Sequence, residues 1–279
     1  MTNWNEVLEN DFAVPSGRPP SELASELYAM LGSPDPKVRD DTAFPVLAYW
    51  VSRGVFDGQL DVVGDELIAR ISEGPIYQRT FATISLVWVL LRDAKTSELS
   101  SETVLGWLAA FSQWWRDEAD LRPWDPELGW LHAPAHGADL VRAFGRSPKL
   151  GAAELTGLLE LAVDRLMTDQ GYLYSNNEDD RIASGLASVL ARPELSSAEA
   201  VGWIGRLHDA IAAGEPGPVP AWASNSLRTM AALYVMADRG VSSFDPETNK
   251  RGPVMRLPHA AEIKDRLAEA LRVPWAGLG

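Results

Sequence analysis

The sequence predicts an all-α protein of stacked antiparallel helical hairpins, a HEAT- or armadillo-like solenoid. Apolar residues recur three and four positions apart along nearly the whole chain, which is the period of a helix. Pro, Gly and short runs of Asp, Asn or Ser interrupt this period regularly. Successive helix pairs begin roughly 40 to 50 residues apart, the spacing of HEAT and armadillo repeats. Such hairpins can also close into an α/α toroid, and the period does not distinguish the two arrangements.

The interruptions divide the chain into eleven expected helices. In order, these are Ser21–Leu31, Asp35–Arg53, Gln59–Ser72, Pro75–Arg92, Ser100–Asp117, Leu131–Phe144, Ala152–Met167, Asp179–Leu190, Ser197–Ala213, Pro220–Asp238 and His259–Leu271. We expect one helical-repeat domain over residues 1–279, with residues 1–20 as a loosely ordered N-terminal arm. The one short strand candidate, Tyr172–Tyr174, is expected to form a turn or a bridge at most, and a long polar loop is expected over Ser242–Leu257.

Individual helices carry their own signals. The first has Leu23, Leu27 and Leu31 on one face. Ser100 precedes a helix and offers its hydroxyl to the free N–H groups of the first turn. An arginine also stands near the start of every second helix, at Arg39, Arg79, Arg181 and Arg228. These arginines either pack against the preceding turn or line a basic stripe on a concave face.

Composition limits the classes of function. The chain has 25 basic and 39 acidic residues and a net charge of −14, which argues against binding to a phosphate backbone. Cysteine is absent, so disulfides, thiolate metal sites and a cysteine nucleophile are excluded. The longest apolar run, Phe81–Leu91, is shorter than the roughly 20 residues that span a bilayer. With no basic and apolar leader at the N-terminus, we expect a cytoplasmic protein that does not enter the membrane.

One segment, Gly129–Asp139, concentrates ligand-type side chains. His132, His136 and Asp139 are spaced by four and three residues, so a helix would carry all three on one face. Two histidines and a carboxylate can hold a divalent metal and leave a coordination position open. Trp124 and Trp130 lie close by and could form aromatic walls of a pocket.

Pro134 complicates the metal hypothesis. Proline is tolerated only in the first turn of a helix, so His132 must lie at or just outside the helix N-terminus. His132 and His136 then need not share a face. The same residues could bind an anion or a small molecule at the helix N-terminus. They could also be purely structural, with His136 hydrogen-bonded to Asp139.

A second polar segment, Asn176–Arg181, contains Glu178, Asp179 and Asp180 before Arg181. Acids in a first helical turn complement the helix dipole, so capping is their simplest role. If this helix neighbours the histidine segment, Glu178 or Asp180 could act as a general base and Arg181 could contact a ligand.

The histidine segment also resembles a known family. The string GWLHAPAHGADL at residues 129–140 looks like the signature of a bacterial family catalogued as domain of unknown function 2785 (DUF2785). Weaker similarity appears at Glu178–Ala183 and Asp35–Asp41, and the resemblance spans about Asp35 to Leu190. It implies an all-helical fold and singles out His132, His136 and Asp139, but it implies no reaction.

Two hypotheses of function follow. In the first, the protein is a binding scaffold for a peptide, a protein or a small ligand, with its site near Gly129–Asp139. In the second, it is a metal-assisted hydrolase or lyase in which His132, His136 and Asp139 hold the ion. Glu178 or Asp180 would then supply the base.

Overall fold

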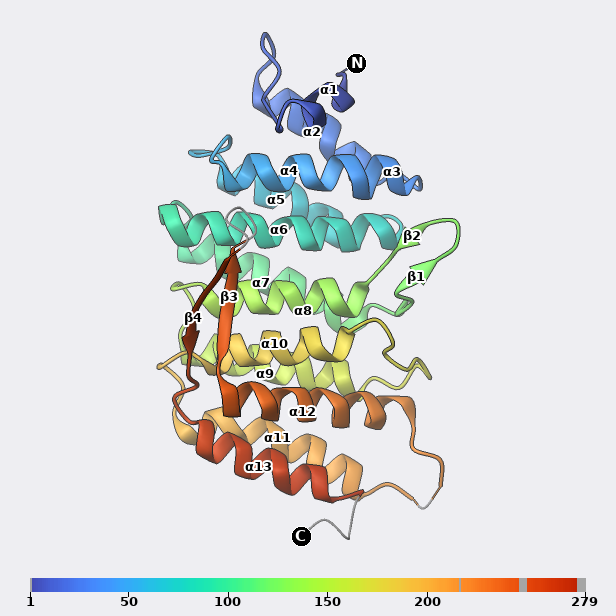
Figure 1. The fold of residues 1–279 in the computed structure, drawn as a ribbon, viewed down its shortest axis with the longest axis vertical. Helices are drawn as coiled ribbons and strands as arrows, with labels where there is room; N and C mark the ends of the chain where they lie inside the picture. Colours follow the sequence, from blue (N-terminus) through green and yellow to red (C-terminus); the bar gives the residue numbers. More distant parts are fainter. Residues whose placement is uncertain (1, 216, 246–249, 275–279) are drawn as a thin grey trace. The chain divides into compact units, whose positions relative to one another are not determined.

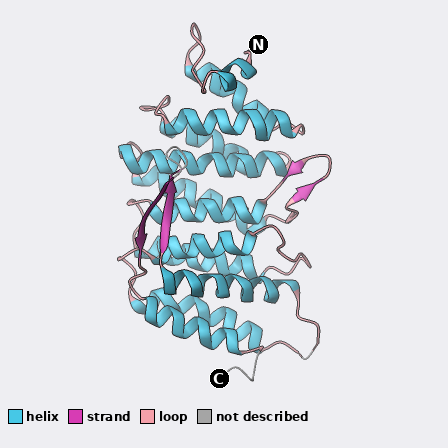
Figure 2. Ribbon diagram, in the orientation of Figure 1, coloured by secondary structure: helices cyan, strands magenta, loops and turns pink. Residues whose placement is uncertain are grey.

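The computed structural model describes residues 2–215, 217–245 and 250–274, and helices dominate them, as the sequence predicts (Figures 1 and 2). The chain divides into two compact units. Unit 1 comprises Met1–Leu140 and Ser147–Lys149, and unit 2 comprises Val141–Arg146 and Leu150–Gly279. Among the described residues, no helix is both long enough and apolar enough to cross a membrane.

Unit 1 consists of two layers of helices. Its elements are α1 (Trp4–Glu9), α2 (Pro20–Leu31), α3 (Pro36–Val38), the π-helix η1 (Arg39–Ala43), α4 (Phe44–Ser52), α5 (Leu60–Ile71), α6 (Ile76–Thr96), α7 (Ser101–Asp117), β1 (Trp124–Asp125), β2 (Gly129–Trp130) and the first part of α8 (Ala133–Arg146). Helices α2, α4 and α6 contact one another, α5 contacts α7, and α5 packs on α6 between the layers (Figure 1). Neighbouring helices of one layer therefore pack side by side, and α5 joins the two layers through α6.

Unit 2 repeats this contact pattern. Its elements are α9 (Ala152–Met167), α10 (Glu178–Leu190), α11 (Ser197–Ala212), α12 (Ala221–Arg239), β3 (Val241–Asp245), β4 (Lys250–Met255) and α13 (Ala260–Arg272). Helix α10 packs on α12, and α11 packs on both α9 and α13. Contacts of α9 with α10 and of α12 with α13 join the two layers.

The apolar face and the helix cap expected from the sequence are both present in the structure. Leu23, Leu27 and Leu31 are fully buried on one face of α2. The Ser100 side chain accepts a hydrogen bond from the backbone N–H of Thr103 at 3.0 Å and so caps α7. In the segment expected to be a loosely ordered arm, α1 forms and its Trp4 ring lies 5.9 Å from the Trp50 ring.

The helix expected over Asp35–Arg53 is not one regular helix. It consists of α3, η1 and α4, and within it the N–H of Phe44 bonds to the carbonyl of Arg39, five residues back. Pro45 explains the irregularity, because it has no N–H and its ring clashes with the carbonyl four residues earlier. The chain avoids that clash by widening one turn into a π-helix.

Two small antiparallel sheets were not predicted. In the first, Trp124 pairs with Trp130 and Asp125 pairs with Gly129. The second pairs β3 with β4 inside Ser242–Leu257, which was expected to be a loop, although residues 246–249 of that range lie outside the described part of the chain. Tyr172–Tyr174 forms no strand, in keeping with the turn or bridge at most that the sequence predicts.

A close approach between α7 and α8 fixes where the histidine segment lies. The Trp115 indole is buried, its Nε1 donates to the Ala133 carbonyl at 3.3 Å, and its ring covers Gly137. A Cβ added to Gly137 would stand 2.0 Å from Trp115 Nε1. The close packing therefore requires glycine at residue 137.

We predict that Gly137→Ala lowers the free energy of unfolding by about 3 kcal/mol, because the methyl group overpacks a buried ring that has no room to move. Urea denaturation measures this. Gly106→Ala is the matched control, since a Cβ at that position of α7 meets no atom within 4 Å. It should leave stability unchanged or raise it by up to about 1 kcal/mol through helix propensity. Equal effects of the two substitutions would contradict the packing argument.

Candidate functional site

The histidine segment adopts the arrangement that Pro134 predicts. Helix α8 begins at Ala133, so His132 lies just outside the helix, and its carbonyl accepts the N–H of His136 at 2.8 Å. Pro134 occupies the first turn, where its missing N–H costs no hydrogen bond. The backbone of His132 has φ +52°, in the left-handed region. A side chain there is strained by about 1 kcal/mol or more, so surrounding contacts must hold it in place.

Aromatic rings run from the surface of unit 1 into its core. Trp124 packs edge-to-face on Trp130 with centroids 5.2 Å apart, and Trp130 stacks parallel on His132 at 4.3 Å. His132 lies 5.4 Å from His136, which meets Phe81 edge-on at 5.5 Å. Trp124 and Trp130 are 50% and 40% exposed, whereas His136 is only 7% exposed. The two indoles are thus the part of this series that a ligand can reach.

His136 is held by the main chain of α6. Its Nδ1 lies 3.1 Å from the carbonyl oxygen of Thr80. Because a carbonyl oxygen only accepts, Nδ1 must carry the proton and donate it. This bond fixes the tautomer and the orientation of the ring.

The buried guanidinium of Arg39 holds the β1–β2 hairpin in position. Arg39 is fully buried, and its Nη1 donates to the Ser33 carbonyl at 2.9 Å. Its Nη2 donates to the carbonyls of Leu128 at 2.5 Å and Trp130 at 3.5 Å. Packing of an arginine against the preceding turn, one of the two expectations for this residue, is therefore confirmed. Arg79 does the same, through a bond from Nη1 to the Gly74 carbonyl.

Two rings and one carboxylate complete the surroundings of Arg39. The guanidinium carbon lies 5.2 Å from the centroid of the Tyr77 ring and 4.8 Å from that of Phe81. Its Nε forms an ion pair with Asp40 Oδ1 at 2.6 Å. Rings and carboxylate together compensate the buried positive charge.

Asp40 has an unusual acidity. Burial raises the pKa of Asp40 to about 6, and the negative charge of Asp41 adds to the rise. The opposing effects, from Arg39 and from the backbone N–H of Trp130, are smaller than that of burial. A carboxyl group with a pKa near neutral therefore lies against the main chain of the β1–β2 hairpin, at Trp130. Asp40 was not among the site residues expected from the sequence. The local feature that could have drawn attention to it is Pro45, which produces the π-helix that carries Asp40.

The structure does not assemble the predicted metal set. Asp139 is half-buried on α8 in the same unit as His132 and His136. Across the residues that the structure describes, no three His, Asp or Glu side chains lie where they could share a metal ion. The arrangement at this point is one of stacked rings.

The predicted residues of the second polar segment lie in unit 2. Glu178 is fully buried and accepts the Tyr172 hydroxyl at 3.2 Å and the Asn176 N–H at 2.7 Å, so it closes the turn before α10. Asp180 is exposed in the first turn of α10, and Arg181 is half-buried beside it. Glu178 thus holds the turn that precedes α10.

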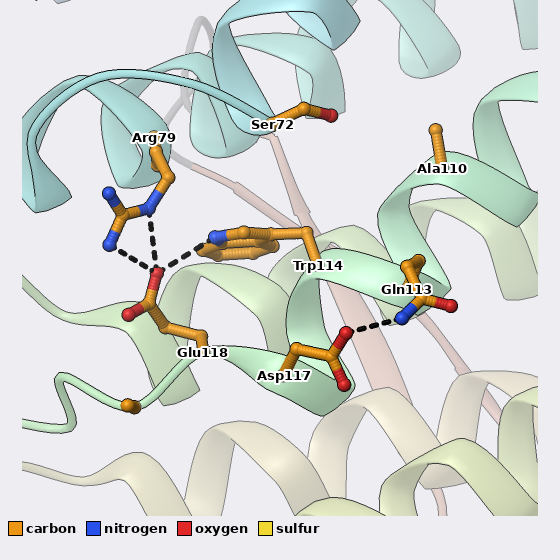
Figure 3. A pocket seen from close by; sticks show the side chains of 8 residues that line it. Ser72, Arg79, Ala110, Gln113, Trp114, Asp117 and Glu118 are labelled. Atoms are coloured by element: carbon orange, nitrogen blue, oxygen red, sulfur yellow. Dashed lines mark hydrogen bonds and ion pairs between the residues drawn. The ribbon is translucent and has the colours of Figure 1, made fainter.

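A cavity of about 490 Å³ lies beside the start of α6 and the end of α7 (Figure 3). It is lined by Ser72, Arg79, Ala110, Gln113, Trp114, Asp117, Glu118 and Ala119. The carboxylate of Glu118 pairs with Arg79 at 2.7 Å and accepts Trp114 Nε1 at 2.9 Å. Gln113 donates to Asp117. Much of the polar lining is thus paired within the protein.

Comparison with protein families gives one match. Residues 67–235, more than half of the chain, match the family described as "Protein of unknown function (DUF2785)". The chain belongs to the DUF2785 family. The match begins later and extends further than the resemblance at Asp35–Leu190 indicated. Searches of curated proteins and of solved structures found no match.

The DUF2785 match covers only part of the site. Trp124, Trp130, His132 and His136 lie inside residues 67–235. Arg39, which holds the hairpin, precedes the matched region, as does its neighbour in sequence, Asp40. The site of this DUF2785 protein is thus completed by a segment outside the part that matches the family.

We predict a pH-dependent stability difference between the wild-type protein and Asp40→Asn. The folded state holds the Asp40 proton up to about pH 6, whereas the ordinary pKa is 3.8, so this carboxyl favours folding at low pH. That contribution is lost as the pH rises through about 6. Urea unfolding from pH 4.5 to 7.5 should therefore show wild type losing stability relative to Asp40→Asn.

Asp41→Asn is the control for this experiment. The variant retains Asp40, so the pH-dependent loss should persist, at slightly lower pH because the Asp41 charge no longer raises the pKa of Asp40. A stability difference between wild type and Asp40→Asn that stays constant with pH would show that Asp40 ionises normally in the folded protein.

Proposed function

We propose that this DUF2785 protein is a helical-repeat scaffold that binds a peptide, a protein or a small ligand through the surface around Trp124 and Trp130. The observation that supports this is the exposure of two contacting tryptophans, at 50% and 40%, on a hairpin held by a buried arginine. Tryptophan is highly buried on average and is enriched among the residues that dominate binding energies. Fixed in place, these rings lose little entropy when a partner binds.

The contact pattern within each unit supports the repeat architecture. Helices two places apart pack side by side, as α4 and α6 do in unit 1 and α10 and α12 do in unit 2. A stack of hairpins produces this pattern, because each hairpin buries its apolar face on the next one. We propose an open HEAT- or armadillo-like solenoid and keep the closed α/α toroid as the alternative.

Small-angle X-ray scattering separates these two forms. A compact chain of 279 residues has a radius of gyration of about 19 Å. The open solenoid predicts a clearly larger radius and an asymmetric distance distribution. A radius of about 19 Å with a symmetric distribution would favour the toroid.

The metal-assisted hydrolase or lyase has weaker support. The described side chains include no group of three that could share a metal ion.

The binding surface can be tested with fluorine NMR. In protein labelled with 5-fluorotryptophan, Trp→Phe variants assign the 11 tryptophan signals. We predict that at least one class in a panel of acidic, neutral polar, apolar and basic short peptides shifts the Trp124 and Trp130 signals saturably. The buried Trp50 and Trp203 are internal controls whose signals should not move. Unmoved Trp124 and Trp130 signals across the whole panel would refute the proposed site.

A further inference from the structure

We propose that Trp124 and Trp130 bind lysine or arginine side chains of a partner polypeptide. This inference rests on the proposed function and adds the chemical class of the partner. It starts from the exposed indole rings, since the face of an indole is the aromatic surface that attracts a cation most strongly. From the sequence alone, the same tryptophans are expected as aromatic walls of a pocket, with no preference for a charge.

The charges beside the tryptophans have the sign that such a partner requires. Carboxylates flank them on two segments of unit 1: Asp120, Asp125 and Glu127 in and before the hairpin, and Asp40 and Asp41 on η1. Glu127 and Asp41 are exposed. An incoming anion would be repelled here, whereas an ammonium or guanidinium group would be attracted.

Two arginines of the same region are already engaged, whereas Lys37 on α3 is exposed. Arg122 pairs with Asp120 at 2.7 Å and with Asp125 at 2.8 Å. Arg39 is fully buried and pairs with Asp40. Over residues 37–41 and 120–130, the five carboxylates outnumber the three cations Lys37, Arg39 and Arg122.

The protein already uses this chemistry internally. The Arg39 guanidinium lies over two aromatic rings and is completed by a carboxylate and by backbone carbonyls. Trp124 and Trp130 offer rings and nearby carboxylates in the same way, but on the surface. Small-molecule sites are concave, and the cavity of about 490 Å³ is lined by other residues. Side chains presented by a polypeptide therefore suit the exposed indole pair better than an enclosed small cation.

The test uses four peptides of one Gly/Ser sequence that differ at three positions. The three positions of a given peptide are all lysine, all arginine, all norleucine or all citrulline. Norleucine and citrulline keep nearly the side-chain shapes of lysine and arginine without the charge. Binding is measured in 150 mM salt by the fluorine signals of Trp124 and Trp130. We expect the lysine and arginine peptides to shift both signals saturably and the neutral peptides to bind at least tenfold more weakly.

Variants locate the interaction. The double variant Trp124→Leu, Trp130→Leu retains apolar bulk but removes the indoles. It should lower the affinity for the lysine and arginine peptides about tenfold, as measured by calorimetry. Glu127→Lys reverses a single exposed charge in the hairpin and should lower the affinity for the basic peptides several-fold. This variant tests the inference independently if the double variant folds poorly. Glu102→Lys changes the net charge equally at the start of α7 and should have little effect.

The remaining outcomes overturn the inference in distinguishable ways. If the neutral peptides bind as well as the basic ones, the surface is an apolar binding site, so the proposed function stands and the cation preference fails. If the basic peptides bind without shifting Trp124 and Trp130, they are attracted only by the general negative charge, and the inference fails. If no peptide of any class shifts these signals, the proposed site fails with it.

Discussion

One buried charge holds the candidate site together. Arg39 lies under the β1–β2 hairpin with no exposed surface, so each of its N–H groups needs a partner inside the protein. The carbonyls of Ser33, Leu128 and Trp130 accept hydrogen bonds from its Nη1 and Nη2, and its Nε forms an ion pair with the carboxylate of Asp40. Breaking a buried pair of this kind typically costs about 3 to 5 kcal/mol. The position of the exposed tryptophans therefore depends on a side chain that a ligand cannot reach.

Two departures from regular backbone lie next to this charge. The π-turn of η1, forced by Pro45, carries Arg39 and Asp40. The left-handed backbone of His132 allows its ring to stack under Trp130 just before α8 begins. The local chain itself produces the π-turn, whereas the left-handed conformation of His132 is unfavourable and persists because tertiary contacts hold it in place. Regular helices at these points would place the same side chains elsewhere.

The candidate site combines residues inside the region that matches DUF2785 with residues outside it. The aromatic series lies within residues 67–235, which match DUF2785, whereas the buried arginine comes from an earlier segment. A fragment limited to the matched residues would keep Trp124 and Trp130 but lose Arg39. The hairpin, only two residues long on each strand, has few hydrogen bonds of its own to replace that support.

The sequence by itself determined the helices, the absence of thiol chemistry and the place of His132 outside α8. Helical period and capping are local properties, and Pro134 allows only one position for the start of the helix. Only the tertiary structure decided that Glu178 closes a turn and that burial raises the pKa of Asp40 to about 6. Those outcomes depend on burial and on contacts between segments distant in sequence. No local pattern contains that information, and strands of two residues are too short to show a period.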